Sequence, residues 1–546
     1  MSAGAGVRGV PPGRRRLALG GAIAALVVLP LVSGALATAS IVGLVRIPAE
    51  SIVALLVLAL IPWRMLRLAV ATAFGALVAV AVLVAGIDRG YQAALGIHFV
   101  PLDWPQLGDA YGVVASAIGS AAASAVFTVA VMLVVAVGVT AGWAALHVDA
   151  ALRHRGDHGR AALATVTVAW IVMAVAAPPL RLPDPVAVAA SASSLGSAVS
   201  RAVSALETRA RVARQVAADP YAGVPATDLL TALEGKDVLF VFVESYGRVA
   251  LEGDDISDGV HDVLRRGEET LGGDGYASRS AWLTSPTFGG VSWLAHATLQ
   301  TGVWIDAQAV YDLVVRTDRL TLSAAFGRAG WRTVSDVPSN RHPWDVGSSF
   351  YRYDTMLDAT NVGYRGPSFG YAQIPDQYTL KHFADQVLAA SERPVMAEID
   401  LVSSHTPWAP LPRLLPWADV GDGSIYDAQP AQSEQMSEVW KDPRTVQRHY
   451  GRSIEYALGS VLSFLENVDD PNLVVIMLGD HQPAAIVSGE DADRDVPISI
   501  IARDPAVFDE IAEWEWTSGL RPSDASPVWS MDAFRDRFFA AYRSAG

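Results

Sequence analysis

Long apolar stretches occupy most of the first third of the chain, separated by short segments that carry the charged residues. A helix needs about 20 consecutive apolar residues to cross the hydrocarbon core of a bilayer. Four uncharged stretches meet this length, and a fifth is shorter and weaker. They lie at 17–39, 68–87, 113–147 and 161–180, with the weaker one at 51–63. We therefore predict a five-helix transmembrane bundle within a domain spanning residues 1–182.

The basic residues between these stretches predict an orientation. Cytoplasmic loops are enriched in Lys and Arg, and here the arginines alternate with the sparsely charged loops near 40–50 and 88–112. A cleavable signal peptide is the alternative for the first stretch, but the further stretches favour an anchor. The amino terminus is thus expected in the cytoplasm, and five crossings place the rest outside it, as in a multi-pass cell-membrane protein. The arginines concerned are Arg14, Arg15, Arg16, Arg64, Arg67, Arg153, Arg155 and Arg160.

The pattern changes after residue 182. Residues 183–224 are rich in Ala, Ser, Val and Arg and predict a helical connector. From 225 to 546, strand-like runs alternate with helix-like ones, which is typical of an α/β domain with covering helices. The stretch 408–437, rich in Pro, Gly, Ser and Asp, is interpreted as a long surface loop that acts as a lid. The predicted strands are 238–243, 395–401 and 473–478, and the predicted helices are 256–271, 320–329, 376–391, 446–466 and 530–543.

Charge and composition narrow the function. The chain is 51% hydrophobic, with a mean hydropathy of +0.29 and a net charge of −15. The basic excess is confined to the first 181 residues, so the part after them is strongly acidic and nucleic acid is an unexpected partner. The chain has no cysteine. The outer domain therefore has no disulfides, and any metal there has oxygen and nitrogen ligands.

Polar residues stop two of the apolar runs. LVVIMLG at 473–479 ends at Asp480 and His481, and VLFVFV at 238–243 ends at Glu244. Two buried strands that end this way deliver three ligands to one rim of a sheet, and this ligand set suits a divalent cation. Alternatively, Asp480 and His481 cap a strand and open a turn. The second strand end favours the metal site.

A serine follows a Gly-Gly turn in the segment SPTFGGVSWLAHATLQTG, residues 285–302. Ser292 is expected at the start of a helix, where a hydroxyl meets a partial positive charge. Beside a divalent cation, such a hydroxyl becomes an alkoxide nucleophile without a histidine base. The alternative is that Ser292 is only an N-cap.

These motifs resemble the alkaline phosphatase and sulfatase superfamily, and within it the membrane-anchored lipoteichoic acid synthase branch. The resemblance covers most of 236–485. The spacings of the sulfatase nucleophile box are occupied here by Ser292, Leu294, His296, Leu299, Thr301 and Gly302. Leu294 and His296 replace the Pro and Arg that guide conversion to formylglycine, so the resemblance implies an unmodified serine.

The resemblance also implies a ligand set. Glu244-Ser245 stands where sulfatases have paired aspartates, which is similar to the single-metal site of lipoteichoic acid synthases and phosphoethanolamine transferases. It implies one divalent ion, expected to be Mn with Mg, Ca or Zn as alternatives, bound by Glu244, Ser292, Asp480 and His481. Because the family nucleophile is typically Thr, Thr287 and Thr298 are the alternatives to Ser292.

Substrate-binding roles follow from the same resemblance. His405 follows a strand-like run, as does a family histidine that contacts the substrate phosphate, and it is expected to hold an oxyanion or to protonate the leaving group. Trp344 and Arg341 lie in a polar loop where this branch places a Trp and an Arg around the substrate headgroup. His296 is expected to bind substrate as well. The alternatives are structural roles for each of these side chains.

The expected function is transfer of a phospho-alcohol group, such as phosphoglycerol, from a membrane lipid to a glycan or lipid acceptor of the cell envelope. Ser292 carries the group as a covalent intermediate. One alternative is a phosphodiesterase or sulfatase-like hydrolase that uses the same site with water as acceptor. A non-catalytic membrane receptor or scaffold is the more distant alternative.

Overall fold

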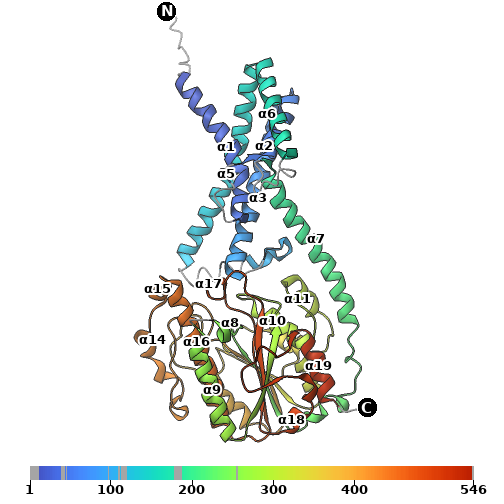
Figure 1. Ribbon diagram of the computed structural model, residues 1–546, viewed down its shortest axis with the longest axis vertical. Helices are drawn as coiled ribbons and strands as arrows, with labels where there is room; N and C mark the ends of the chain where they lie inside the picture. The colour runs from blue at the N-terminus through green and yellow to red at the C-terminus, as the bar shows by residue number, and fades with distance from the viewer. Residues whose placement is uncertain are drawn as a thin grey trace, which may run out of the picture. The chain divides into compact units, whose positions relative to one another are not determined.

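A computed structural model of the chain describes residues 12–38, 44, 46–95, 98–107, 111, 120–176, 187–253 and 256–543. Contacts within the chain divide it into two compact units, both traced in Figure 1. The N-terminal unit comprises Met1–Gln92 and His98–Leu206. The C-terminal unit comprises Ala93–Ile97 and Glu207–Gly546.

Helices form the N-terminal unit. Among the described residues, four of them, α1, α3, α5 and α6, are long and apolar enough to cross a membrane. The predicted second span corresponds to α2, whose 12 residues cover about 18 Å as a straight helix, against a hydrocarbon core of about 30 Å. All five predicted apolar helices are present, and the count of crossings depends on α2. The helices are α1 (Pro12–Thr38), α2 (Ala49–Leu60), α3 (Arg64–Leu95), α5 (Ser120–His154), α6 (Asp157–Ala176) and α7 (Ala190–Ala217), the last within the predicted connector.

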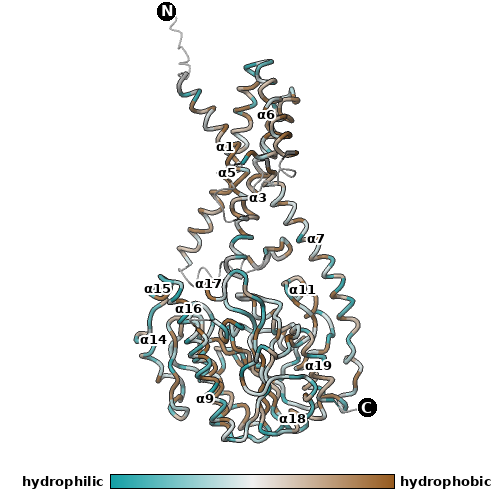
Figure 2. The backbone as a smooth tube through the Cα atoms, in the orientation of Figure 1, coloured by the Kyte–Doolittle hydropathy of each residue, from teal (hydrophilic) through white to brown (hydrophobic). Residues whose placement is uncertain are grey.

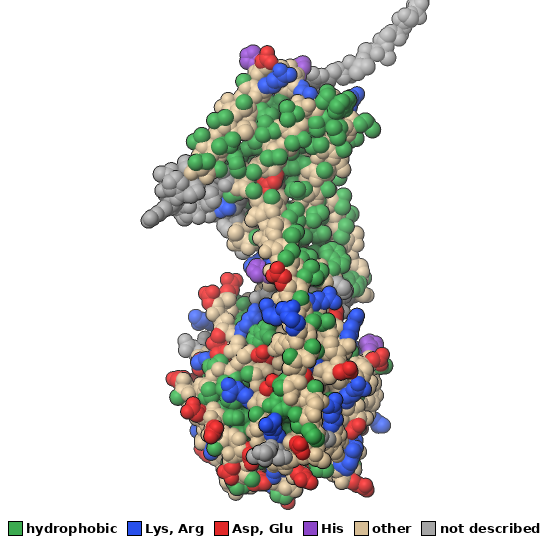
Figure 3. Space-filling view, turned by 90° about the vertical axis from the view of Figure 1, so that its right-hand side faces the viewer, with side chains coloured by type: hydrophobic (Ala, Val, Ile, Leu, Met, Phe, Trp, Pro, Cys, Tyr) green, Lys and Arg blue, Asp and Glu red, His purple; other side chains and the backbone are tan. Residues whose placement is uncertain are grey.

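The outer surface of these helices is apolar. Val131, Leu133 and Val139 on α5 are all more than half exposed. Hydrophobic residues are frequent along these helices in Figure 2, and hydrophobic side chains cover much of the face of this unit in Figure 3. Small residues instead face the neighbouring helix: a Cβ on Gly75 of α3 would lie 2.3 Å from the Gly138 carbonyl oxygen of α5. Small residues inside and large apolar ones outside are typical of helices packed within lipid.

The C-terminal unit is built on a nine-stranded sheet in the order β10-β4-β9-β8-β3-β7-β5-β6, with β11 paired to β4. Strands β8, β3, β7, β5 and β6 are mutually parallel, whereas β9 is antiparallel to β8 and β4. The strands are β3 (Asp237–Val243), β4 (Ala277–Thr284), β5 (Arg332–Val337), β6 (Thr355–Asp358), β7 (Val395–Leu401), β8 (Leu473–Gly479), β9 (Asp495–Ala502), β10 (Thr517–Ser518) and β11 (Val528–Ser530).

Helices cover both faces of this sheet (Figure 1). Successive side chains of a strand point to opposite faces, and here both sets are apolar and need covering helices. On β3, Phe240 and Phe242 belong to one core and Leu239 and Val241 to the other. The first core includes residues of α10 (Ser292–Thr301), α11 (Gln308–Val314), α12 (Leu322–Arg328) and α19 (Ala533–Tyr542). The second includes residues of α9 (Ser257–Gly273), α13 (Asp376–Phe383) and α16 (Pro443–Asn467). The predicted α/β domain is confirmed.

The elements differ from the sequence prediction in two places. Six strands of the sheet were not predicted, because their runs include charged, hydroxyl or proline residues; they are β4, β5, β6, β9, β10 and β11. The stretch 408–437, predicted as a long loop, contains short helical turns at Trp417–Asp419, Ser424–Tyr426 and Gln429–Gln432. Val420 and Tyr426 are fully buried there and pack in a small core of their own. This segment is therefore packed against the domain, and a role as a lid stays a prediction.

Candidate active site

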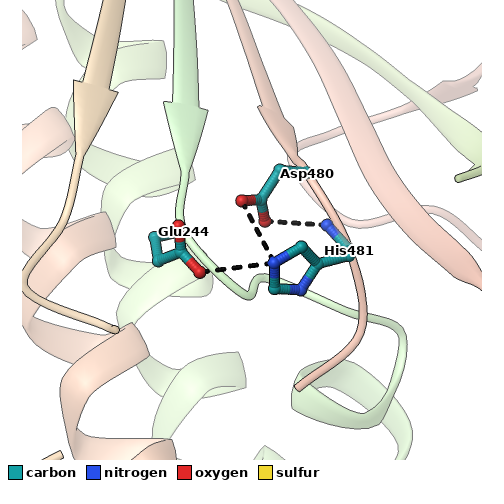
Figure 4. A group of neighbouring side chains, drawn as sticks. All are labelled: Glu244, Asp480 and His481. Atoms are coloured by element: carbon teal, nitrogen blue, oxygen red, sulfur yellow. Dashed lines mark hydrogen bonds and ion pairs between the residues drawn. The ribbon is translucent and has the colours of Figure 1, made fainter. Parts of the chain in front are cut away.

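Two central parallel strands bring their ends together at one rim of the sheet. Val243, the last residue of β3, is paired with Gly479, the last residue of β8. Glu244 and Asp480 follow directly, and His481 comes next (Figure 4). The backbones approach closely here, since a Cβ on Gly479 would lie 1.9 Å from the Tyr246 carbonyl oxygen. Glycine at this position therefore lets the two strand ends meet.

Ser292 joins this group from the first turn of α10. Its Oγ lies 3.0 Å from Glu244 Oε2 and 3.1 Å from His481 Nε2. His481 Nε2 lies 3.4 Å from Glu244 Oε1 and 3.6 Å from Asp480 Oδ2. The structure thus brings together the four residues predicted as metal ligands, which are called the four-donor group below.

The imidazole of His481 presents a lone pair to this group. Its Nδ1 lies 2.8 Å from the Gln482 carbonyl oxygen, which can only accept, so Nδ1 carries the hydrogen. In the neutral ring Nε2 is then unprotonated, and a hydrogen bond of this kind orients a metal-binding histidine. The ring is 1% exposed. It is held in the tautomer that a cation at Nε2 requires.

The carboxylates of the four-donor group differ in how they are satisfied. Asp480 Oδ1 accepts hydrogen bonds of 2.7 Å from the backbone nitrogens of Ser245 and His481, whereas Oδ2 is buried without a hydrogen-bond partner in the described structure. Burial and the charge of Glu244 raise the pKa of Asp480 to about 6. A buried, unpaired carboxylate oxygen is costly, and a divalent cation among the four donors would satisfy it.

Glu244 remains ionised in the same surroundings. Burial opposes its charge, but the rings of His405 and His481, when protonated, and a hydrogen bond from Ser245 lower its pKa to about 2. The Ser245 hydroxyl donates to Glu244 Oε1 over 2.8 Å. These residues fit the predicted metal. They offer two carboxylates, an imidazole nitrogen and a hydroxyl, which is a ligand set that suits a small divalent ion.

Strained backbone lies beside two of the four donors. Ser245 has φ 58° and Val291 has φ 58°, both in the left-handed region. For a β-branched residue such as Val291 this conformation is an outlier, and such outliers cluster at functional sites. Gly289 and Gly290 precede it with φ 71° and 155°. The predicted Gly-Gly turn therefore exists, and it aims Ser292 at the group.

The two alternative nucleophiles are placed elsewhere. Thr287 is 1% exposed and within 3.3 Å of the Ser285 hydroxyl. Thr298 is fully buried, and its Oγ1 donates to the Leu294 carbonyl oxygen over 2.7 Å. Ser292 is the hydroxyl that contacts both Glu244 and His481.

His405 follows β7 and lies near the group, since the hydroxyl of the preceding Ser404 donates to the Glu244 carbonyl oxygen over 2.6 Å. Its ring stacks on Tyr371 with centroids 3.6 Å apart. Its Nδ1 lies 2.6 Å from the Thr406 carbonyl oxygen. The carbonyl holds the hydrogen on Nδ1, so Nε2 is the ring atom available to a substrate.

The other predicted substrate-binding residues are spread around the rim. Trp344 is half-buried and packs on Tyr351 and Tyr353, at 5.3 and 6.4 Å between ring centroids. Arg341 is exposed, and its charge acts on Tyr371. Trp344 is thus part of an aromatic cluster, and Arg341 lies near the ring that stacks on His405. Their substrate roles stay predictions.

Sequence reasoning missed two carboxylates beside His296. Its Nδ1 lies 3.1 Å from Glu398 Oε1 and 3.4 Å from Asp400 Oδ1. Together with Glu244, Asp480 and His481, these are the two groups of converging His and acidic side chains in the described part of the chain. Glu398 and Asp400 lie two residues apart on β7, so both point to one face. That spacing inside a buried strand was the available signal.

The chain resembles known proteins in structure but not in sequence. No protein-family model matches the chain, and no curated protein sequence matches it. Solved structures do resemble it. Lipooligosaccharide phosphoethanolamine transferase A (EptA) from Neisseria meningitidis is 13% identical, covers 96% of this chain and 95% of its own, and has a TM-score of 0.43.

Two further solved structures resemble mainly part of the chain. Phosphoglycerol transferase GacH from Streptococcus pyogenes is 15% identical over 61% of this chain and 81% of its own, with a TM-score of 0.37. Lipoteichoic acid synthase LtaP from Listeria monocytogenes is 12% identical over 58% and 74%, with a TM-score of 0.34. Likenesses at these values do not decide an activity, which must be argued from the site.

Proposed function

We propose that this chain is a metal-dependent transferase of the alkaline phosphatase and sulfatase type, which moves a phospho-alcohol group from a membrane lipid to a cell-envelope acceptor. The observation that carries the proposal is the position of Ser292, whose Oγ is within 3.1 Å of both Glu244 and His481. A hydroxyl that completes a set of metal-type ligands is placed to act as a nucleophile.

The four-donor group has two roles: all four residues would bind the ion, and Ser292 would also act as the nucleophile. Glu244, Asp480, His481 and Ser292 would hold one divalent ion, which when bound lowers the pKa of a ligated hydroxyl and offsets negative charge on a phosphoryl group. Ser292 sits at the first turn of α10, where the free backbone amides favour a developing negative charge. The Ser292 hydroxyl would lose its proton to solvent when the ion binds. The serine oxygen would then attack phosphorus, and a bond would form between Oγ and phosphorus.

The leaving group needs a proton. The phosphorus–oxygen bond to the lipid alcohol breaks as the Oγ–phosphorus bond forms, so an alkoxide departs. His405 would protonate it from Nε2 if the ring enters the step as the imidazolium, because Nδ1 stays bound to the Thr406 carbonyl oxygen. The ring is then left neutral with a free lone pair on Nε2. In the second step the acceptor alcohol loses its proton to the same ring, attacks phosphorus and releases Ser292.

Exposed aromatic side chains beside the site support a lipid substrate. Trp293 follows the nucleophile and is 41% exposed, and Tyr371 over His405 is 45% exposed. Aromatic rings of this kind are enriched where proteins meet the bilayer surface. The apolar helices of the same chain would keep the site close to its substrate.

The covalent step is tested on the full-length chain in phospholipid nanodiscs with Mn and phosphatidylglycerol. We expect an intact-mass increase of one phosphoglycerol group on the wild type and release of diacylglycerol. Ser292→Ala should form no adduct, and Ser292→Thr should retain the adduct because it keeps the hydroxyl. Equal products from wild type and Ser292→Ala would refute the nucleophile. Free glycerol phosphate as the sole product, with an acceptor alcohol present, would indicate the hydrolase alternative.

The placement of the C-terminal unit outside the cytoplasm is part of the proposal and needs an odd number of crossings, which depends on α2. Because the chain has no cysteine, single introduced cysteines report topology without background. A cysteine at the exposed Glu392 should react with an impermeant maleimide in intact cells, and one at the exposed Arg155 should react only after lysis. The reverse pattern would refute the orientation.

A further inference from the structure

The group formed by His296, Glu398 and Asp400 has no part in the steps above. It lies one helical turn from the nucleophile, because Ser292 and His296 are four residues apart on α10 and share a face. The charge of Asp480 also acts on the imidazole. The group is therefore a neighbour of the four-donor group.

We propose that Glu398 and Asp400 are positioning residues that hold His296 as a fixed imidazolium, whose Nε2–H donates to a phosphoryl oxygen of the substrate. The first half rests on the geometry of the group alone. The second half also rests on the proposed function.

Glu398 is itself locked in place. Its Oε2 accepts hydrogen bonds from the Tyr353 hydroxyl over 2.9 Å and from Gln300 Nε2 over 2.5 Å. Its Oε1 faces His296 Nδ1 at 3.1 Å. An oxygen pair that receives three donors is best satisfied as an ionised carboxylate. Glu398 therefore fixes both the position and the orientation of the ring.

The ring is fixed from its face as well. His296 stacks on Phe242 of β3, with centroids 3.8 Å apart and planes 12° from parallel. A cation over an aromatic face is favourable. Within the described structure Nε2 has no hydrogen-bond partner, whereas Nδ1 has two carboxylates.

The surrounding charges favour the doubly protonated ring. Burial alone would lower the pKa of His296, but Asp400 and Glu398 on β7 and Asp480 after β8 raise it to about 10. Burial raises the pKa of Asp400 to about 7, opposed by the charge of His296. Glu398 is the carboxylate that is hydrogen-bonded to the ring, and it is the residue to change.

The test uses the full-length chain in nanodiscs, loaded with Mn, and inorganic phosphate as the probe, measured by calorimetry between pH 5.5 and 9. In Glu398→Gln the ring loses a charged partner, so its pKa falls and its charge is lost as the pH rises. We expect phosphate affinity equal to wild type at pH 5.5 and weaker by about tenfold at pH 9, the worth of one charge-assisted hydrogen bond. The ratio of variant to wild type cancels the titration of the metal ligands.

The matched control is Asp336→Asn, a buried carboxyl on the adjacent strand β5 that is 1% exposed. It should leave phosphate affinity unchanged at pH 5.5, where Asp336 keeps its proton and Asn is its neutral mimic. His296→Gln keeps a donor without the charge and should weaken binding at all pH values. A loss in Glu398→Gln that is the same at every pH, or no loss at all, would overturn the inference, because a merely structural role predicts no recovery at low pH.

Two measurements do not depend on the proposed function. Histidine-labelled protein examined by ¹⁵N NMR, with His296→Gln to assign the signal, should show a protonated His296 ring at pH 7.5 in the wild type, and a neutral ring would refute the inference. Metal analysis should give one ion per chain in both wild type and Glu398→Gln. A second ion that is lost in the variant would show that the group binds metal instead. If wild-type protein forms no adduct on Ser292 yet His296 is protonated, the proposed function fails and the positioning by Glu398 stands.

Discussion

Two groups with the same composition, one histidine and two carboxylates, lie side by side at this rim of the sheet. In the first, Asp480 Oδ2 is buried without a partner, and His481 offers Nε2 as a lone pair because Nδ1 donates to a carbonyl. In the second, Asp400 Oδ1 is likewise buried without a hydrogen bond in the described structure, but Glu398 receives two neutral donors and His296 turns Nδ1 toward both carboxylates. The first group lacks a cation of its own, and the second contains one.

The backbone contact of one ring nitrogen accounts for this difference. A carbonyl oxygen at Nδ1 fixes a neutral ring with an accepting Nε2, which is suited to a metal. Carboxylates at Nδ1 favour a charged ring, which is suited to an anion. The same three residue types therefore serve metal binding or oxyanion binding according to what touches the histidine.

The largest expected difference between the two groups is the loss of activity when Asp480 is changed. Asp480→Asn removes one charged ligand of the four-donor group and should reduce transferase activity by about a thousandfold or more, since the activated hydroxyl depends on the ion. Activity and bound metal are measured on the same nanodisc sample. Asp336→Asn, an equally buried change, should keep both. Full activity in Asp480→Asn would mean that the group does not bind the catalytic metal.

Metal removal should separate the two groups by stability. Chelation leaves Glu244 and Asp480 as buried like charges, so the melting temperature of the C-terminal unit should fall, by an amount equivalent to about 3 kcal/mol for an ion at a hundred times its Kd. Asp480→Asn should melt at the same temperature with and without chelator. Its metal-free form should exceed metal-free wild type, because the repulsion is gone.

Removing a negative charge from the second group should lower the stability of the protein, where the same change in the metal-free first group raises it. Glu398→Gln removes the acceptor of three hydrogen bonds and should lower the free energy of unfolding by about 1–3 kcal/mol. The loss should be the same with Mn and with chelator. Urea unfolding followed by tryptophan fluorescence measures both conditions. A variant that is stabilised by the change would show that Glu398 is an uncompensated charge, as in the first group.

The sequence predicted the first group better than the second for a physical reason. Glu244 and Asp480 interrupt apolar runs, so they stand out where a buried strand ends. The pairing of β3 with β8 was not readable, and neither was the left-handed Val291 that brings Ser292 to the group, because both depend on contacts distant in sequence. Glu398 and Asp400 were missed since the run 395–401 reads as a buried strand in spite of them. Roles for Trp344 and Arg341 rest on a loop whose conformation no local pattern specifies.

A pH-dependent effect is expected at Asp336 of β5, whose carboxyl lies close enough to Asp400 for their charges to interact. Burial, with the charges of Asp400 and Asp358, raises its pKa to about 8, and both its carboxylate oxygens lack hydrogen-bond partners in the described structure. The folded state therefore keeps a proton that the unfolded chain releases above pH 3.8. Its contribution to stability is fully present below that pH and is lost as the pH rises toward 8, with a slope of up to about 1.4 kcal/mol per pH unit.

Asp336→Asn mimics the protonated carboxyl and removes this dependence. We expect the variant to match wild type near pH 4 and to be the more stable protein at pH 8, measured as the free energy of unfolding in urea across that range. A wild-type stability that rises over the same interval, with no difference in the variant, would mean that Asp336 is ionised in the folded state. The charge of Asp336 would then oppose the ionisation of Asp400, one of the two carboxylates beside His296.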